Sequence, residues 1–207
     1  MRFITYADGD HEGVAVRTEA GYRGRPVASL GGDLTSFLGD RERLAGLAAT
    51  LADAPEVRLD AVTLLPPVPR PGKILCIGLN YQSHSAEGGF ETPTYPTVFA
   101  RFANSLVGHG SPLVRPDASD LLDYECELAV VVGRGGRHIP RERALEHVAG
   151  YSVFNDGSVR DFQMRSPQWT MGKVFDATGA FGPELVTPRS CPRAAPACAS
   201  GPSSTAR

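Results

Sequence analysis

Two glutamates that alternate along a strand-like segment are the first residues whose spacing suggests chemistry. Glu125 and Glu127 follow Tyr124 and lead into the apolar run 128–132. Residues two apart in a strand face the same side, so both carboxylates project together and repel each other unless a cation or water lies between them. A solvated strand face is the alternative. The apolar run is typical of a strand buried on both faces, which favours a pair that points into a pocket.

A third carboxylate follows at the end of another strand-like segment. Asp156 lies in the run Phe-Asn-Asp-Gly-Ser, residues 154–158, at a turn where protein scaffolds often present functional groups. Three carboxylates without thiolate or imidazole partners suit a hard cation, with Mg²⁺ expected before Mn²⁺ or Ca²⁺. For Asp156 taken alone, an ordinary Asn-Asp-Gly turn is the alternative.

Two further segments carry groups that could move a proton or bind an anion. If residues 80–87 form one or two helical turns, His84 and Glu87 lie on one face, three residues apart. A carboxylate beside an imidazole raises its basicity, as the activation of water requires; an exposed pair is the alternative. Lys173, one of only two lysines, could pair with a substrate carboxylate or an enolate oxygen, or could lie at the surface.

The first 65 residues predict a hairpin and a helix. Apolar residues repeat at period two over residues 2–18, on both sides of a turn at Asp8–Asp10. From Asp40, which suits a helix N-cap, leucine and alanine recur at helical spacing until Pro55 stops the pattern. These elements predict a small N-terminal domain at residues 1–65.

A Pro-rich stretch at residues 66–72 predicts a stiff linker, because it suits neither a helix nor a central strand. Beyond it, short β-rich runs at residues 73–78, 97–102, 124–133 and 150–154 predict strands. Pro140–His147 predicts a helix with Ala144, Leu145 and Val148 on its apolar side. We therefore expect a mainly β domain at residues 73–188.

The tail at residues 189–207 has a different composition. It contains three prolines and no Val, Ile, Leu, Phe, Tyr or Trp, so it cannot contribute a core element. Two explanations stay open: an ordinary disordered terminus, or unrelated sequence in place of the natural continuation of the fold.

The overall composition excludes several classes of function. The 207 residues include 21 basic and 23 acidic side chains, for a formal net charge of -2, which argues against a nucleic-acid partner. The longest apolar run, residues 128–132, is far shorter than the ~20 residues of a membrane span, and the N-terminus lacks the apolar stretch of a signal peptide. The four cysteines show no zinc-ligand spacing. We expect a soluble, cytoplasmic protein without a membrane partner.

Four ordered motifs make the chain resemble the fumarylacetoacetate hydrolase family. They are K-I-L-C-I-G-L-N-Y-x-x-H-x-x-E, D-Y-E-C-E-L-A-V-V-V-G, A-G-Y-S-V-F-N-D-G-S-V-R-D-F-Q and Q-W-T-M-G-K-V-F-D, and together they cover about residues 71–187. The resemblance implies an α+β fold. Its catalytic domain would be a mainly β, mixed roll, preceded by a small N-terminal α+β domain and usually assembled as a homodimer.

The resemblance also implies roles for individual residues. The implied ligands of Mg²⁺, Mn²⁺ or Ca²⁺ are Glu125, Glu127 and Asp156. The implied catalytic residues are His84, Glu87 and Lys173, of which the first two would form the dyad that activates water or moves a proton. The implied substrate-binding residues are Arg160, Gln163 and Tyr81.

The activity that the resemblance implies is metal-dependent chemistry on small 2-oxo or 1,3-dicarbonyl acids. Hydrolysis of the C–C bond of acylpyruvate-type substrates, as in aromatic catabolism, is the first expectation. An oxaloacetate-type decarboxylase and a 2-oxo-dienoate isomerase or hydratase are alternatives that the shared motifs do not distinguish. In the family, further strands and a Thr-Gly-Thr-Pro type motif follow the position of Thr187, and this chain lacks that motif. The roll is therefore expected to be incomplete, and a truncated non-catalytic remnant is a further alternative.

Overall fold

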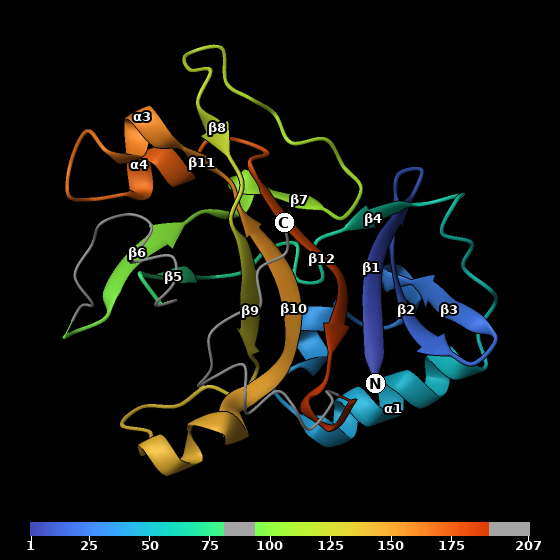
Figure 1. Ribbon diagram of the computed structural model, residues 1–207. Helices are drawn as coiled ribbons and strands as arrows, with labels where there is room; N and C mark the ends of the chain where they lie inside the picture. Colours follow the sequence, from blue (N-terminus) through green and yellow to red (C-terminus); the bar gives the residue numbers. More distant parts are fainter. Residues whose placement is uncertain (81–93, 191–207) are drawn as a thin grey trace.

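A mixed eight-stranded sheet forms the centre of the molecule (Figure 1). The structure is a computed structural model and describes residues 1–80 and 94–190. The main path of the sheet is β3 (Gly21–Pro26), β2 (His11–Thr18), β1 (Arg2–Asp8), β12 (Gly179–Val186), β10 (Val148–Asp156) and β9 (Cys126–Val132). Off this path, β4 (Thr63–Leu65) pairs with β1, and β7 (Leu106–Gly108) pairs with β12. The β7–β12 pair is parallel, and the other pairs of this sheet are antiparallel.

Two small sheets and several short helices complete the described part of the chain. β5 (Ile74–Gly78) pairs with β6 (Thr97–Arg101), and β8 (Leu122–Asp123) pairs with β11 (Ser158–Val159). The α-helices of this part are α1 (Arg41–Ala52), α3 (Arg160–Gln163) and α4 (Thr170–Lys173). Its 3₁₀ helices are Val27–Ser29, Leu34–Phe37, Ala103–Ser105, Arg141–His147 and Pro188–Ser190. None of the helices among the described residues is long and apolar enough to cross a membrane.

The hairpin and the first helix form where the sequence predicts them. β1 and β2 pair antiparallel from Asp8 opposite His11 onward, and Gly9 supplies the positive φ that their tight turn requires. Asp40 caps α1, because its side chain accepts hydrogen bonds from the backbone N–H groups of Glu42 and Arg43. The leucines of the apolar face, Leu44, Leu47 and Leu51, are buried. Both predictions are confirmed.

One hydrophobic core joins the two ends of the chain. Phe3 of β1 belongs to the same cluster as Leu51 of α1 and Leu185 of β12, and β1 pairs directly with β12. Residues 66–72 form neither helix nor strand, yet Val68 is buried in this cluster. The expected boundary at the Pro-rich stretch therefore does not interrupt the sheet or its core, and the division into two domains stays a prediction.

Strand β9 differs from the sequence-based expectation. Its apolar run was expected to be buried on both faces, but every second residue is exposed: Leu128 and Val130 are 50% exposed and Val132 is 67% exposed. The inward side chains Ala129 and Val131 pack against the core. The same face is uncovered by the described residues on the neighbouring strand too, because Val153 of β10, which lies opposite Leu128, is 54% exposed. The expectation of two buried faces is wrong.

The segment expected to be a helix at Pro140–His147 is a 3₁₀ helix at Arg141–His147. The expected apolar side does not pack inward, because Leu145 is 72% exposed while Val148 already belongs to β10. Because the helix ends at His147 and the chain continues as a strand from Val148, Ala144, Leu145 and Val148 do not lie on one side of a single helix.

Candidate active site

The paired strands β9 and β10 bring the three carboxylates together. Glu127 lies opposite Phe154 in the antiparallel register. The backbone N–H of Asp156 donates to the carbonyl of Glu125 at 2.9 Å, and the N–H of Glu125 donates to Asn155 Oδ1 at 3.0 Å. One carboxylate oxygen from each of Glu125, Glu127 and Asp156 lies within 4.8 Å of the other two. The structure therefore clusters the residues that the sequence proposes as metal ligands.

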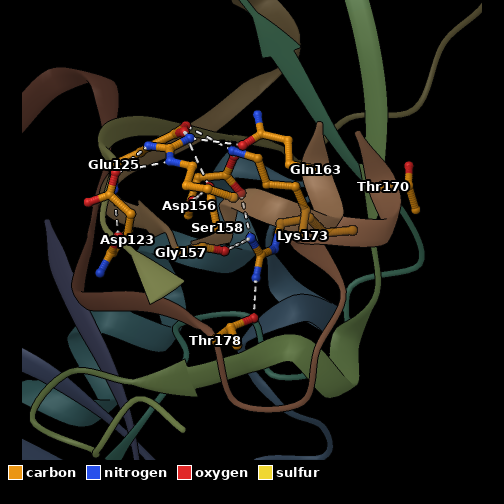
Figure 2. A network of polar contacts seen from close by, with 12 residues as sticks. Asp123, Glu125, Asp156, Gly157, Ser158, Gln163, Thr170, Lys173 and Thr178 are labelled. Atoms are coloured by element: carbon orange, nitrogen blue, oxygen red, sulfur yellow. Dashed lines mark hydrogen bonds and ion pairs between the residues drawn. The ribbon is translucent and has the colours of Figure 1, made fainter. Parts of the chain in front are cut away.

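The ammonium group of Lys173 lies between two of these carboxylates (Figure 2). Its Nζ is 2.9 Å from Glu125 Oε2 and 2.6 Å from Asp156 Oδ2, and it lies 5.2 Å from the centroid of the Phe99 ring. The side chain is only 2% exposed. The sequence left open whether Lys173 lies at the surface. The structure shows that it is buried with two anionic partners.

Arg160 and Gln163 approach the cluster from α3. The Arg160 guanidinium donates to Glu125, to Asp123 Oδ2 at 2.8 Å and to Gln163 Oε1 at 2.9 Å. Ser158 Oγ lies 3.2 Å from Glu125 Oε1. Figure 2 shows Asp123, Ser158 and Gln163 around Glu125 and Asp156. Arg160 and Lys173 thus both contact Glu125, and Gln163 contacts Arg160. The roles of these three residues in binding and catalysis stay predictions.

Arg101, at the end of β6, is a member of the cluster that sequence analysis missed. Its Nη1 donates to Asp156 Oδ1 at 2.6 Å, and its side chain is fully buried. The chain contains many arginines and only two lysines, so residue type alone does not single out this one. Sequence analysis also missed Asp123 and Ser158. Each belongs to a strand of two residues, which is too short to show a pattern in the sequence.

Burial and charge separate the acidities of the two glutamates. Burial, with the charges of Asp156 and Glu125, raises the pKa of Glu127 to about 7. Burial also acts to raise the pKa of Glu125, but Lys173 and Arg160 outweigh it and hold that pKa below its ordinary value. Near neutral pH, Glu125 is therefore ionised, whereas Glu127 is partly protonated.

The cluster suits a hard divalent cation by its donor chemistry. Carboxylate oxygens are the ligands that Mg²⁺ and Mn²⁺ prefer, and the three acids supply them from neighbouring strand ends. The Lys173 ammonium between Glu125 and Asp156 indicates that this position already accommodates positive charge. The residues present therefore fit such an ion.

Three of the expected site residues, Tyr81, His84 and Glu87, lie outside the described residues. They follow β5, which ends at Gly78. A Cβ atom at Gly78 would lie 2.1 Å from Trp169 Cζ3, so the end of β5 packs tightly against the residue that precedes α4. The roles of Tyr81, His84 and Glu87 stay predictions.

Comparison with known proteins identifies the family of this chain. The family model described as fumarylacetoacetate (FAA) hydrolase C-terminal matches residues 73–200. The chain belongs to the fumarylacetoacetate hydrolase family. The four sequence motifs had indicated this membership, and it is confirmed.

Relatives in this family carry the names of enzymes. The human mitochondrial oxaloacetate tautomerase FAHD2A is 43% identical over 158 residues, a match that covers 74% of this chain and 50% of the relative. The rat mitochondrial oxaloacetate tautomerase Fahd2a is 37% identical, with 90% of this chain and 63% of the relative covered. The chain therefore spans between half and two thirds of the length of these curated relatives.

Solved structures of the family share the fold. The fumarylacetoacetate hydrolase of Exiguobacterium antarcticum is 30% identical, with a TM-score of 0.75 over 94% of this chain and 69% of that one. The maleylpyruvate hydrolase of Sphingobium sp. SYK-6, in complex with manganese(II) and pyruvate, is 25% identical, with a TM-score of 0.72 over 92% of this chain and 69% of that one.

Proposed function

We propose that this chain carries the active site of a divalent-metal-dependent enzyme that acts on small 2-oxo acids. The cluster of Glu125, Glu127 and Asp156 carries this proposal, because three converging carboxylates suit a divalent cation. These three residues would hold Mg²⁺ or Mn²⁺, and the Sphingobium relative was crystallised with manganese. When bound, the metal would act as a Lewis acid towards the oxygens of a 2-oxo acid.

The chain's own cations would bind and stabilise the anionic substrate. Arg160 is 29% exposed and forms one edge of the cluster, so its guanidinium, with the amide of Gln163, would orient the substrate carboxylate. Lys173 would donate a hydrogen bond to the oxygen that gains negative charge as an enol forms. The structure of the Sphingobium enzyme contains pyruvate, which is a 2-oxo acid. This supports the proposed substrate class.

Proton transfer is assigned to residues that follow β5. We propose that His84, oriented by Glu87, moves a proton to or from the carbon next to the oxo group, and that Tyr81 contributes to substrate binding. A His84→Gln variant should lower kcat by about 10²-fold or more while the protein still binds Mn²⁺. Loss of Mn²⁺ binding in this variant would instead indicate a role in the metal site.

We propose tautomerisation of oxaloacetate as the reaction. It moves one proton between the carbon at position 3 and the oxygen at position 2, and it breaks no C–C bond. The human and rat relatives carry this activity in their names. Hydrolysis of an acylpyruvate is the second candidate, because the maleylpyruvate hydrolase shares the fold. Decarboxylation of oxaloacetate is a third outcome of the same assay, and a non-catalytic remnant would show none of them.

The test is an assay of the purified 207-residue chain with Mn²⁺ or Mg²⁺. Enol disappearance would be followed by ultraviolet absorbance, and pyruvate or carboxylic-acid products by NMR. We expect metal-dependent tautomerisation that Glu127→Gln abolishes and that Arg143→Met leaves unchanged, because Arg143 pairs with Glu146 on an exposed 3₁₀ helix. Turnover that survives both Glu127→Gln and a chelator would reject the proposed site.

We also propose that two copies of the chain form a homodimer. The outward residues of β9, including Leu128, Val130 and Val132, form an exposed apolar row at the end of the main strand path, and such rows are typical of association surfaces. Light scattering should give twice the monomer mass, and a Leu128→Gln/Val130→Gln double variant should be monomeric. A monomeric unaltered chain would contradict this proposal.

The cytoplasmic location stays a prediction. It was based on the N-terminal sequence, whereas the human and rat relatives are named as mitochondrial. Fluorescence of a tagged chain in its own cells would test it.

A further inference from the structure

Arg101 is the most extensively bonded buried cation among the described residues. Its side chain has a relative exposure of 0%. Nη1 donates to Asp156 Oδ1 at 2.6 Å and to the Gly157 carbonyl at 3.0 Å. Nη2 donates to Thr178 Oγ1 at 3.0 Å, and Nε donates to Ser105 Oγ at 3.3 Å. One guanidinium therefore joins the end of β6 to the end of β10 and to the residue before β12.

The surroundings of Arg101 are shaped to this side chain. A Cβ atom at Gly179 would lie only 2.8 Å from Arg101 Nη2, so glycine leaves room for the guanidinium. The Phe154 ring centroid lies 5.5 Å from Arg101 Cζ, within the range of a cation–π contact. A buried charge is costly unless it is paired and hydrogen-bonded, and here every nitrogen of the guanidinium has an acceptor.

Arg101 and Lys173 divide the two oxygens of Asp156 between them. Arg101 binds Oδ1, whereas Lys173 binds Oδ2 and also Glu125. In Figure 2, Asp156 and Gly157 lie between Asp123 and Lys173, and Thr178 lies below them. The contact of Arg101 with the Gly157 carbonyl holds the backbone next to Asp156. Asp156 is thus held through its side chain and through the adjacent peptide.

We propose that Arg101 is a positioning residue for the metal ligand Asp156. By binding Oδ1, it fixes the orientation of the carboxylate, so that Oδ2 meets the Lys173 ammonium, which also contacts Glu125. The lone pair of Oδ2 that Lys173 does not use would then be the one offered to a cation. This inference rests on the proposed function, because it needs Asp156 to be a ligand. Arg101 itself touches neither metal nor substrate in this role. The planar guanidinium can donate hydrogen bonds to Asp156, Gly157 and Thr178 at the same time. A lysine ammonium is less suited to these three contacts.

The experiment is a titration of the full 207-residue chain with Mn²⁺, measured by calorimetry and by the electron paramagnetic resonance of free Mn²⁺. Loss of a residue that orients a metal ligand typically weakens binding by 10- to 100-fold. We expect a loss of about that size for Arg101→Met and a smaller, several-fold loss for Arg101→Lys.

Thr178→Val is the matched control. It removes the acceptor of Arg101 Nη2 but leaves the bond from Nη1 to Asp156, so it disturbs the same buried cluster without releasing the ligand. We expect a lower unfolding temperature with Mn²⁺ affinity within about threefold of the unaltered chain. Equal losses of affinity in Thr178→Val and Arg101→Met would show that general destabilisation is responsible, and would overturn the inference.

The remaining outcomes separate this inference from the proposed function. If the unaltered chain and Arg101→Met bind Mn²⁺ equally well while Asp156→Asn does not bind, the metal site stands and the role of Arg101 is wrong. If the unaltered chain binds no Mn²⁺, the proposed metal site is wrong and the inference fails with it. Should Arg101→Met not fold, Arg101→Lys decides by the same criterion, and unchanged affinity in that variant overturns the inference.

Discussion

At the scale of single residues, positive charge from three side chains holds mutually repelling carboxylates together. Lys173 bridges Glu125 and Asp156, and Arg160 and Arg101 each bind one of them. Such a buried network tolerates the loss of a partner poorly, because the remaining charge is left uncompensated away from water. The state of each residue in the cluster therefore depends on its neighbours.

Removing the Lys173 ammonium should destabilise the metal-free protein. We expect Lys173→Met to lower the free energy of unfolding by about 3 kcal/mol in chelator, because Glu125 and Asp156 then repel each other without a bridging cation. Added Mn²⁺ should restore more stability to this variant than to the unaltered chain. Urea unfolding measures both effects. Lys73→Met is the control, since Lys73 is exposed, and equal losses in both variants would contradict the bridging role.

The raised pKa of Glu127 predicts a pH dependence of stability. Burial raises this pKa from 4.5 to about 7, so the folded protein holds the proton more tightly than the unfolded chain does. The stabilisation from protonation is complete below about pH 4.5 and is lost as the pH rises through about 7. The test therefore compares the free energies of unfolding of the unaltered chain and Glu127→Gln in chelator. As the pH rises from about 5 to about 8, this free energy should fall by about 2 kcal/mol more for the unaltered chain than for Glu127→Gln. If the free energy of unfolding changes by the same amount in both proteins across this pH range, the prediction is wrong.

At the scale of elements, close packing of two one-turn helices places Lys173 and Gln163. A Cβ atom at Gly172 in α4 would lie 2.5 Å from the backbone nitrogen of Gln163 and 2.7 Å from its Cα. Only glycine allows this approach, because the obstructing atoms belong to the backbone of α3. The position of α4, and hence of the Lys173 ammonium, depends on that contact.

Gly172→Ala should therefore separate α3 from α4. We expect kcat to fall more than tenfold and the free energy of unfolding to fall by about 1–3 kcal/mol, as overpacking typically costs. Gly46→Ala in α1 is the matched control, because its Cβ atom would meet nothing within 4 Å, and alanine there should stabilise the helix by about 0.5–1 kcal/mol. Activity assays and thermal unfolding measure both variants. Full activity of Gly172→Ala would contradict the packing argument.

At the scale of the whole molecule, the N-terminal hairpin belongs to the sheet that positions the site. β1 lies between β2 and β12, and β12 pairs with β10, which ends at Asp156. The largest core cluster contains Phe3 from the first strand and Leu185 from the last. The segments that flank the Pro-rich stretch therefore stabilise each other.

Deletion of residues 1–72 tests the two-domain division. Because the deletion exposes one edge of β12 and removes the side chains that bury Phe154 and Leu185, we expect the shortened chain not to fold. Circular dichroism and the dispersion of amide resonances would measure this. A folded shortened chain that binds Mn²⁺ would instead support an independent domain at residues 73–188.

Several features of the site could be predicted from neighbouring residues alone. The alternation of Glu125 and Glu127 indicates their shared face, and the polar turn at Asp156 indicates a third carboxylate near a strand end. The burial of β9 could not be predicted in this way. Its apolar run is equally compatible with a strand that is covered on both faces. Only the tertiary structure shows that no described element covers the face that carries Leu128, Val130 and the neighbouring Val153.

The sequence by itself determined the hairpin, the capped helix α1, the family and the identity of the clustered acids, because these depend on patterns within a few residues or on ordered motifs. Only the tertiary structure decided which cations accompany the acids. Lys173 is 48 residues from Glu125, and Arg101 is 55 residues from Asp156 and 77 from Thr178. Pairings over such separations depend on the path of the folded chain, and no local pattern records that path.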